Sequence, residues 1–548
     1  MDTKDEFTDT KLVPPTPSTP PFILSTRFCM ALLVFMAFIV QYCQRVNFPI
    51  VITCMINSPR STLPTIDETT TLPTAFLDQN AIEDETTKMM ILEANSVPQI
   101  QRYNLFFKEK RFYWTEAQQQ LLLGAYWFGY IFTQVPGGWM ATNFGAKRVY
   151  AISLFTSSLS TLALNIMYFM SDTEFILILI LRVLIGLSHG VLFPATVALW
   201  SLWAVPTERG RLVSIGFSGT HLGTSITMLI GGLLCRYIIS GWIFIFFIST
   251  VLGFVWFILW MWKAADSPDV HPTISDEERE YICNITLGGT SKIKKPTMSL
   301  SSIPWEKIVK SKPLLALFVT HICNLFGLFF FLTNIGKIMV QVHKIPVQYA
   351  GFIAAGGFFL TWLSSLLSGA AVDKLVQTKT MSLTSARKLF NSITSFGPVL
   401  CMISLCFCDE TTKPLGIVTI VIFLAFSGLG YGAGYVVNFN DIVPAYSGVI
   451  FGIANTLASL AGVIGNLVAG IVIKQPTLHN WRYLFILFGI VYFVGGVVYV
   501  LFGTAESRTW ATFSAVNEKQ IANAHNAEES VPMKLSGGND DEHPDPRV

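Results

Sequence analysis

The sequence predicts an all-α membrane protein with twelve transmembrane helices arranged as two six-helix bundles. Its composition is the first reason, because 52% of the 548 residues are hydrophobic and only 13% are charged, about half the charged fraction of a soluble protein. The second reason is a series of twelve apolar segments, each providing the roughly 20 residues that cross the hydrocarbon core of a bilayer. The third is a hydrophilic stretch that divides these segments into two groups of six.

The expected spans follow one another in order along the two bundles. The first bundle, 28–262, is expected to contain spans at about 28–56, 117–141, 147–170, 174–201, 212–236 and 241–262. The second bundle, 313–503, is expected to contain spans at about 313–340, 347–372, 386–408, 414–437, 445–473 and 480–503. Between them lies a linker, 263–312, in which "SDEEREYI" (275–282) has the N-cap serine and early acidic residues of a short helix. The polar tails, 1–27 and 504–548, are expected to be disordered, and no cleavable signal peptide is expected.

Lysine and arginine gather in alternate loops, which orients the chain in the bilayer. They occur at 142–148, 202–211 and 373–388 and are most frequent in the linker, whereas the short loop 171–173 has none. The basic loops are therefore predicted to be cytosolic, and an even number of spans puts both termini in the cytosol. The long loop at 57–116 is predicted to be extracytosolic.

The two halves carry similar motifs at corresponding positions. "GGWMATNFGAKR" (137–148) follows the second span, and "SGAAVDKL" (368–375) follows the eighth, with "SARK" (385–388) close behind. Each motif has glycine, a short polar turn and then basic residues, and such repeats are typical of transporters that alternate access around a midplane cavity. The gating candidates from these motifs are Gly138, Arg148, Asp373 and Arg387.

The ionisable residues predicted to lie inside the spans are basic, with no aspartate or glutamate deep in any span. They are Arg45, Arg182, His189, His221, His321 and Lys337. A buried charge is costly and is usually paired or faces a wet cavity. Because guanidinium groups bind carboxylate or phosphate through two parallel hydrogen bonds, the missing partner is predicted to be an anionic substrate.

Each cation also has a structural alternative. Arg45 could extend its guanidinium to the outer membrane interface, and Arg182 could bond the backbone carbonyls of a neighbouring helix. His221 and His321 are better explained as hydrogen-bonded packing residues than as ligands. Lys337 is expected to be an interfacial anchor near the outer end of its span.

Several other functions are not favoured by the sequence. No basic stripe suits nucleic acid, and no Walker-type loop suits ATP. We expect no enzymatic activity, cofactor or metal site, and we expect a monomer whose partners are an anion, a coupling ion and the lipid bilayer. The nine cysteines are scattered, which argues against a disulfide framework.

Longer strings now add a family resemblance. "GAYWFGYIFTQVPGGWMATNFGAKRV", "LRVLIGLSHGVLFPA", "LWSLWAVPTERGRL", "NFNDIVPAYSGVIFGIANT" and the pair Arg45–Asn47 resemble the sialin, vesicular glutamate and sodium–phosphate cotransporter family. These are anion:cation symporters of the major facilitator superfamily, and the resemblance runs from about residue 28 to 511. It implies the major facilitator fold and implies substrate-binding roles for Arg45, Asn47, Tyr130 and Arg182.

The resemblance also bears on the gating positions. Asp441 matches an acidic family position near the cytosolic end, so a role in the gate is expected rather than one in substrate binding. Thr142 stands where the superfamily often has aspartate, whereas Asp373 keeps the acid in the second half. We therefore expect the latch in the second half to be the stronger one.

His189 departs from the family pattern. The glutamate and sialic-acid carriers have a glutamate here that is tied to proton coupling, and this chain has "HG". Histidine titrates near neutrality, but its protonated form adds a positive charge. Three interpretations stay open: His189 relays protons itself, sodium drives transport, or the protein is an anion uniporter.

Together these features predict a secondary active transporter of organic or inorganic anions, carboxylates or phosphate, that is coupled to sodium or protons. The alternatives are an anion uniporter or channel-like carrier, and a non-transporting receptor or scaffold on a carrier fold. A plasma-membrane location is favoured over a vesicular or lysosomal one because neither tail contains an acidic dileucine signal.

Overall fold

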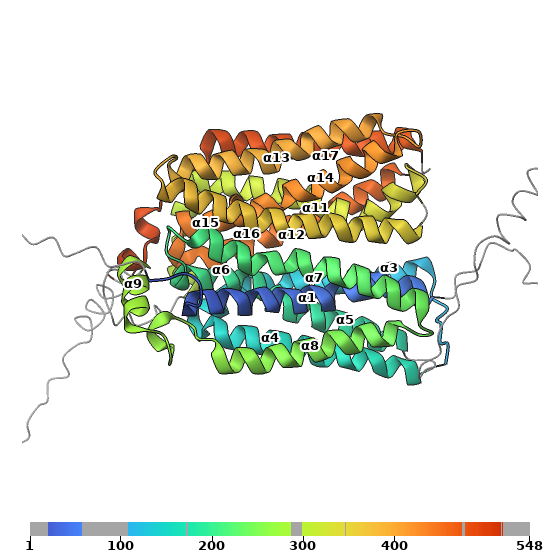
Figure 1. The fold of residues 1–548 in the computed structure, drawn as a ribbon, viewed down its shortest axis with the longest axis horizontal. Coiled ribbons are helices and arrows are strands. Elements are labelled where there is room, and N and C mark those ends of the chain that lie inside the picture. Colours follow the sequence, from blue (N-terminus) through green and yellow to red (C-terminus); the bar gives the residue numbers. More distant parts are fainter. Residues whose placement is uncertain are drawn as a thin grey trace, which may run out of the picture.

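The structure, a computed structural model, describes residues 20–56, 108–170, 174–286, 299–345, 347–473, 477–516 and 518. Within these ranges the regular secondary structure is helical, and Ile56 and Phe112 form an isolated parallel bridge. Most of the expected loop at 57–116 and the outer parts of both tails lie outside the described residues. Figure 1 shows two layers of long helices, the first half of the chain in blue to green and the second half in yellow to red.

The helices agree with the expected spans to within a few residues at most ends. The first bundle contains α1 (Thr26–Met55), α3 (Glu116–Phe144), α4 (Ala146–Leu164), α5 (Glu174–Gly190), α6 (Leu192–Trp203), α7 (Arg209–Tyr237) and α8 (Trp242–Lys263). The second contains α11 (Lys312–Gln341), α12 (Val347–Gln377), α13 (Leu383–Phe407), α14 (Lys413–Gly432), α15 (Tyr435–Ile442), α16 (Ser447–Val472) and α17 (Leu478–Phe502). The fourth span is broken into α5 and α6, and the tenth into α14 and α15, which the apolar pattern did not predict.

Ten helical segments in the described part of the chain are long and apolar enough to cross a membrane. The two remaining spans are α3 and α7, which have 29 residues each and are about 43 Å long at 1.5 Å per residue, enough for a 30 Å core. They are less apolar because they face the other bundle rather than lipid. The buried hydroxyl residues of α7 illustrate this: Ser214, Ser218, Thr220, Thr224, Ser225 and Thr227.

Buried side chains form clusters that reveal how the bundles meet. One cluster joins both bundles near the basic loops, with Trp200 and Phe217 from the first bundle and Phe451 from the second. Toward the opposite end the buried members separate into two clusters. One lies wholly in the first bundle and includes Phe246, and the other lies wholly in the second and includes Phe488. The molecule is therefore closed at the end of the basic loops, while at the other end the buried apolar side chains of the two bundles fall into separate clusters.

The linker contributes a helix where the sequence predicts one. α9 (Asp276–Thr286) begins after Ser275, whose hydroxyl accepts from the Glu278 backbone N–H at 3.3 Å. The Glu278 carboxylate accepts from the backbone N–H groups of Thr26 and Arg27, both at 3.0 Å. The Glu278 carboxylate therefore caps the start of α1, where a negative charge interacts favourably with the helix dipole.

The buried side chain of Arg27 also holds α9 against the first bundle. This side chain is fully buried and pairs with Glu208 at 2.7 Å and with Glu278 at 2.9 Å. The linker is thus bound to the first bundle rather than being a free connection, and α9 lies beyond the helix ends in Figure 1.

The cysteines show one pairing that corrects the expectation from sequence. Cys54, at the end of α1, forms a disulfide with Cys235 near the end of α7, across 181 positions of chain. Both lie at the end away from the basic loops. Scattered spacing did not indicate the pair, because the two helix ends become neighbours only in the packed bundle.

Candidate functional site

Two arginines lie buried near the centre of the molecule. The side chain of Arg45 comes from α1 and that of Arg182 from α5, and the residues are 5% and 1% exposed. Neither therefore reaches a membrane interface, which excludes the alternative that Arg45 extends to the outer surface. Arg182 forms no hydrogen bond to a backbone carbonyl among the described residues. The alternative that it bonds the backbone carbonyls of a neighbouring helix is therefore not supported either.

Aromatic rings surround the Arg45 guanidinium from both bundles. Its central carbon lies 4.5 Å from the ring centre of Trp127, 5.5 Å from that of Tyr130 and 5.8 Å from that of Phe329. Trp127 belongs to the first bundle and Phe329 to the second, and their rings meet edge to face at 5.0 Å. Cation–π contacts of this kind stabilise a desolvated guanidinium but leave its hydrogen-bond donors available.

The two arginines share one aromatic neighbour. Tyr126 has its ring centre 5.5 Å from the Arg45 guanidinium and 5.2 Å from that of Arg182. The two charges are thus close, and no described carboxylate lies within ion-pair distance of either one. Such an arrangement of like charges is unfavourable unless an anion binds between or beside them.

Unused donors identify where that anion could bind. Arg45 Nη2, Arg182 Nε, Arg182 Nη1 and Asn47 Nδ2 are buried and have no hydrogen-bond partner in the described part of the chain. Asn47 is held in place by its own Oδ1, which accepts from the Phe48 backbone N–H at 2.7 Å. Since buried donors are almost always satisfied, four unpaired donors on three predicted residues indicate a site built for an acceptor.

His189 is fully buried at the end of α5 and is held by two neighbours. Its Nε2 lies 3.3 Å from Gln44 Oε1, and its Nδ1 lies 3.4 Å from the Tyr126 hydroxyl. A neutral ring satisfies both contacts if Nε2–H donates to Gln44 and Nδ1 accepts from Tyr126. His189 therefore connects Gln44 on α1 to Tyr126, whose ring contacts both arginines.

Tyr130 joins the two bundles rather than lying alone beside the substrate. Its hydroxyl accepts from Asn455 Nδ2 of α16 at 3.3 Å, and the same amide group donates to Gln134 Oε1 at 2.5 Å. Asn455 Oδ1 in turn lies 3.2 Å from His321 Nε2 on α11. This network places His321 in a hydrogen-bonded packing role, as predicted from sequence, and it links the site to the contact between α3 and α16.

Asp441 is the centre of the closed end. Its carboxylate pairs with Arg209 of the first bundle at 2.7 Å and with Arg387 of the second at 2.9 Å. Arg209 also donates to the Asn440 carbonyl at 3.0 Å. The structure thus brings the predicted gating residues Asp441 and Arg387 together with Arg209, which was not selected from sequence.

Asp373 makes a second contact between the bundles. Its carboxylate accepts from the backbone N–H groups of Gly210 at 3.0 Å and Arg211 at 2.7 Å, at the start of α7. An acid at this position complements the positive end of the helix dipole. Gly138 marks a third contact, because a Cβ there would lie 2.3 Å from the carbonyl oxygen of Gly448 on α16.

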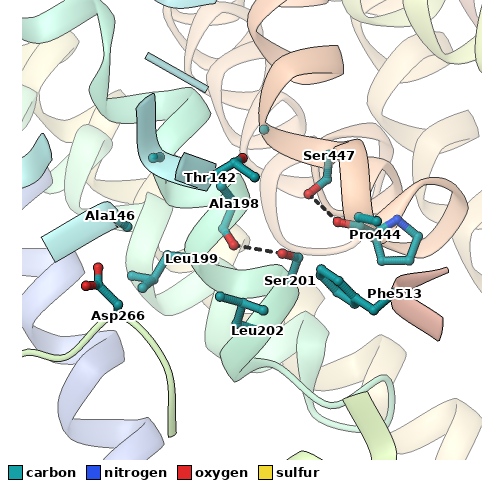
Figure 2. Close-up of a pocket in the computed structure, with 13 residues that line it drawn as sticks. Thr142, Ala146, Ala198, Leu199, Ser201, Leu202, Asp266, Pro444, Ser447 and Phe513 are labelled. Carbon is teal, nitrogen blue, oxygen red and sulfur yellow. Dashed lines mark hydrogen bonds between the residues drawn. The ribbon is translucent and has the colours of Figure 1, made fainter. Parts of the chain in front are cut away.

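Thr142 occupies the position in the first half that corresponds to Asp373, and it makes no hydrogen bond to the other bundle among the described residues. Its hydroxyl donates to the Gly138 carbonyl of its own helix at 2.9 Å, and Ser447 likewise donates to the Pro444 carbonyl. Figure 2 shows Thr142 and Ser447 on either side of a cavity that Phe513 also lines. Its volume is about 40 Å³, which is room for one or two water molecules. This arrangement agrees with a stronger latch in the second half.

Arg148 is not part of these contacts. It lies exposed at the start of α4 and forms no ion pair with a described residue. Its gating role stays a prediction. The sequence-based selection also left out Gln44 and Gln134, although amide side chains at bilayer depth are costly enough to have suggested a function.

Comparisons with known proteins identify the family to which this chain belongs. Residues 30–465 match the family model described as Major Facilitator Superfamily. Human sialin is 31% identical over 512 residues, which cover 92% of this chain and 96% of sialin. Human vesicular glutamate transporter 2 is 30% identical over 431 residues, covering 78% of this chain and 72% of that protein.

Solved structures support the fold. The proton:xylose symporter XylE, bound to 6-bromo-6-deoxy-D-glucose, superimposes with a TM-score of 0.63 and covers 89% of this chain and 98% of its own. Its 14% identity makes this likeness evidence for the fold alone. The chain belongs to the major facilitator superfamily, in the anion:cation symporter branch that includes sialin and the vesicular glutamate transporters, and it is a secondary active anion transporter coupled to protons or sodium.

Proposed function

We propose that the transported anion is an organic carboxylate that binds between Arg45 and Arg182. The four unpaired buried donors on Arg45, Arg182 and Asn47 carry this proposal. Two guanidinium groups and an amide match the acceptor geometry of a carboxylate. The names of the vesicular glutamate transporters point to a carboxylate cargo in those relatives, which makes carboxylates the first class to test.

We propose that both termini and the linker are cytosolic, which makes this an outward-facing form. The support is that the basic loops and α9 lie at the closed end, while the Cys54–Cys235 disulfide lies at the other. Disulfides persist on the oxidising, extracytosolic side of a membrane. Trp127 and Phe329 contact each other across the two bundles beside the Arg45 guanidinium.

His189 is proposed to participate in coupling through Gln44 and Tyr126. Replacing His189 by Glu should steepen the pH dependence of uptake if this position exchanges protons. An unchanged pH profile would remove His189 from the coupling mechanism. The plasma membrane stays a proposal, since several similar proteins are named as vesicular; surface biotinylation of the full chain tests it.

Transport into proteoliposomes tests the binding site directly. Radiolabelled glutamate, sialate, urate and phosphate are offered in turn, with sodium and pH gradients imposed separately. Arg45→Ala and Arg182→Ala should each abolish uptake of the accepted anion while the protein is inserted normally. Arg279→Ala is the matched control, because the ion pair that this arginine forms among the described residues is with the exposed Asp276 in α9. Uptake of phosphate alone would contradict the carboxylate assignment, and full uptake by the Arg45 variant would contradict the site.

A further inference from the structure

A second basic site lies at the cytosolic base of the second bundle, far from the transport site. It is a groove of about 560 Å³ where the end of the linker, the start of α11 and the C-terminal segment meet. The residues that line it are Glu306, Lys307, Lys310, Ser311, Lys312, Pro313, Arg508 and Trp510. Four of these are basic and one is acidic, so the groove carries a net charge of +3.

The groove offers donors that the protein does not use. Arg508 Nε and the Ser311 hydroxyl are buried and have no hydrogen-bond partner among the residues that the structure describes. Lys310 is partly neutralised by Glu306 at 2.5 Å, but Lys307 and Lys312 form no ion pair with a described residue. Several cations and two unused donors in one concave site favour a ligand with more than one negative charge.

The surroundings of the groove favour a ligand that is part of the membrane. Trp305, Val309 and Leu315 on the same segments are 40%, 64% and 42% exposed, as expected for side chains that face lipid. Trp510 adds an aromatic ring to the lining, and tryptophan is enriched at membrane interfaces. Basic pockets at the cytosolic end of transmembrane helices are suited to anionic lipid headgroups.

We propose that this groove binds the phosphorylated headgroup of an anionic membrane lipid, a phosphoinositide, on the cytosolic side. The proposal rests on the orientation proposed above and not on the nature of the transported anion. Lys307, Lys312 and Arg508 bind the headgroup phosphates, and the Ser311 hydroxyl donates to one of their oxygens.

The site is connected to the closed end through the C-terminal segment. The Arg508 backbone N–H donates to the carbonyl of Ile442, next to Asp441, at 2.9 Å. The ring of Trp510 lies 6.0 Å from that of Tyr446, and Phe513 lines the cavity between the bundles in Figure 2. Residues 504–516 were expected in a disordered tail, yet they pack against this end. A headgroup that binds Arg508 therefore also holds residues 504–516 against the closed end of the molecule.

Binding of a short-chain phosphatidylinositol 4,5-bisphosphate to the purified full-length protein in detergent tests the proposal. Each basic residue near an anionic headgroup contributes about fivefold in affinity, so Lys307→Gln with Arg508→Gln should weaken binding about thirtyfold. The matched control, Lys374→Gln with Lys379→Gln, removes two exposed cytosolic charges outside the groove and should bind like the parent. If the double variant does not fold, Lys307→Gln and Lys312→Gln singly should each lose about fivefold.

Three outcomes would overturn the inference. One is equal binding by the groove variants and the control, which would mean nonspecific attraction. Another is equal affinity for short-chain phosphatidylserine. The third is equal affinity for inorganic phosphate or soluble inositol trisphosphate, which would make this a site for a free anion. Arg45→Ala should keep lipid binding while losing transport, so failure of the substrate site is distinguishable from failure of this one.

Discussion

Replacing Arg209 by Gln should shift the protein away from the form closed at the cytosolic end. Arg209 provides the shorter of two ion pairs that cross between the bundles at this end in the described part of the chain, 2.7 Å from Asp441 against 3.4 Å for Arg211 and Asp373. It also donates to the Asn440 carbonyl at 3.0 Å. Arg387 stays paired with Asp441 within the second bundle. The substitution therefore removes a contact that exists only when the cytosolic end is closed, without leaving the carboxylate unpaired.

The size of the shift follows from the burial of the pair. Arg209 and Asp441 are 6% and 4% exposed, so solvent screens them little. A hydrogen bond between charged groups contributes about 1.5–3 kcal/mol, and a loss of about 2 kcal/mol from the closed form changes the ratio of open to closed protein about thirtyfold. Asp441→Asn should shift the equilibrium in the same direction.

Cysteine labelling measures this ratio. Ser447, which is 1% exposed at the start of α16, is replaced by Cys in a background without the seven free cysteines and with the disulfide kept. Maleimide applied to inside-out vesicles should label this cysteine about thirtyfold faster in the Arg209 variant, because it reacts only when the bundles separate. Arg279→Gln should have no effect, since exposed pairs contribute little. A rate within twofold of the parent would refute the assignment of this ion pair as a gate.

Three other properties can be tested independently. Replacing Cys54 and Cys235 by Ser should lower the free energy of unfolding by about 2–4 kcal/mol, seen as a lower melting temperature in detergent; reducing agent should then have no further effect. Phe329→Ala removes the second-bundle ring of the Trp127–Phe329 contact and should speed maleimide labelling, from the extracytosolic side, of a cysteine introduced by Asn47→Cys, whereas an unchanged rate would mean that other residues close the site. Burial and a neighbouring carboxylate raise the pKa of Cys283 to about 12. Because its thiolate is scarce below that pKa, alkylation should be slow at pH 7 and rise tenfold per pH unit to pH 9, measured by mass spectrometry; a plateau below pH 9 would contradict the raised pKa.

Sequence patterns predicted the fold and the main charged residues of the site. The length of each apolar segment is set by bilayer thickness, so α1 and α11 could be located from composition alone. Arg45 and Arg182 stood out because a charge among apolar residues is costly wherever the helices pack. The family resemblance added Asn47 and Tyr130, for which spacing offers no comparable signal.

Local sequence thus determined which segments cross the membrane and that two cations would lie within it without acids nearby. Only the tertiary structure decided how distant segments meet: the Cys54–Cys235 disulfide, the Glu278 cap on α1, the Asn455 network and the pairing of Asp441 with Arg209. The physical reason is that hydropathy acts on each helix by itself, whereas these contacts depend on the rotation and depth of helices that lie hundreds of residues apart. The contacts between the bundles, such as that of Asp441 with Arg209, and not the spans, set which end of the transporter is closed.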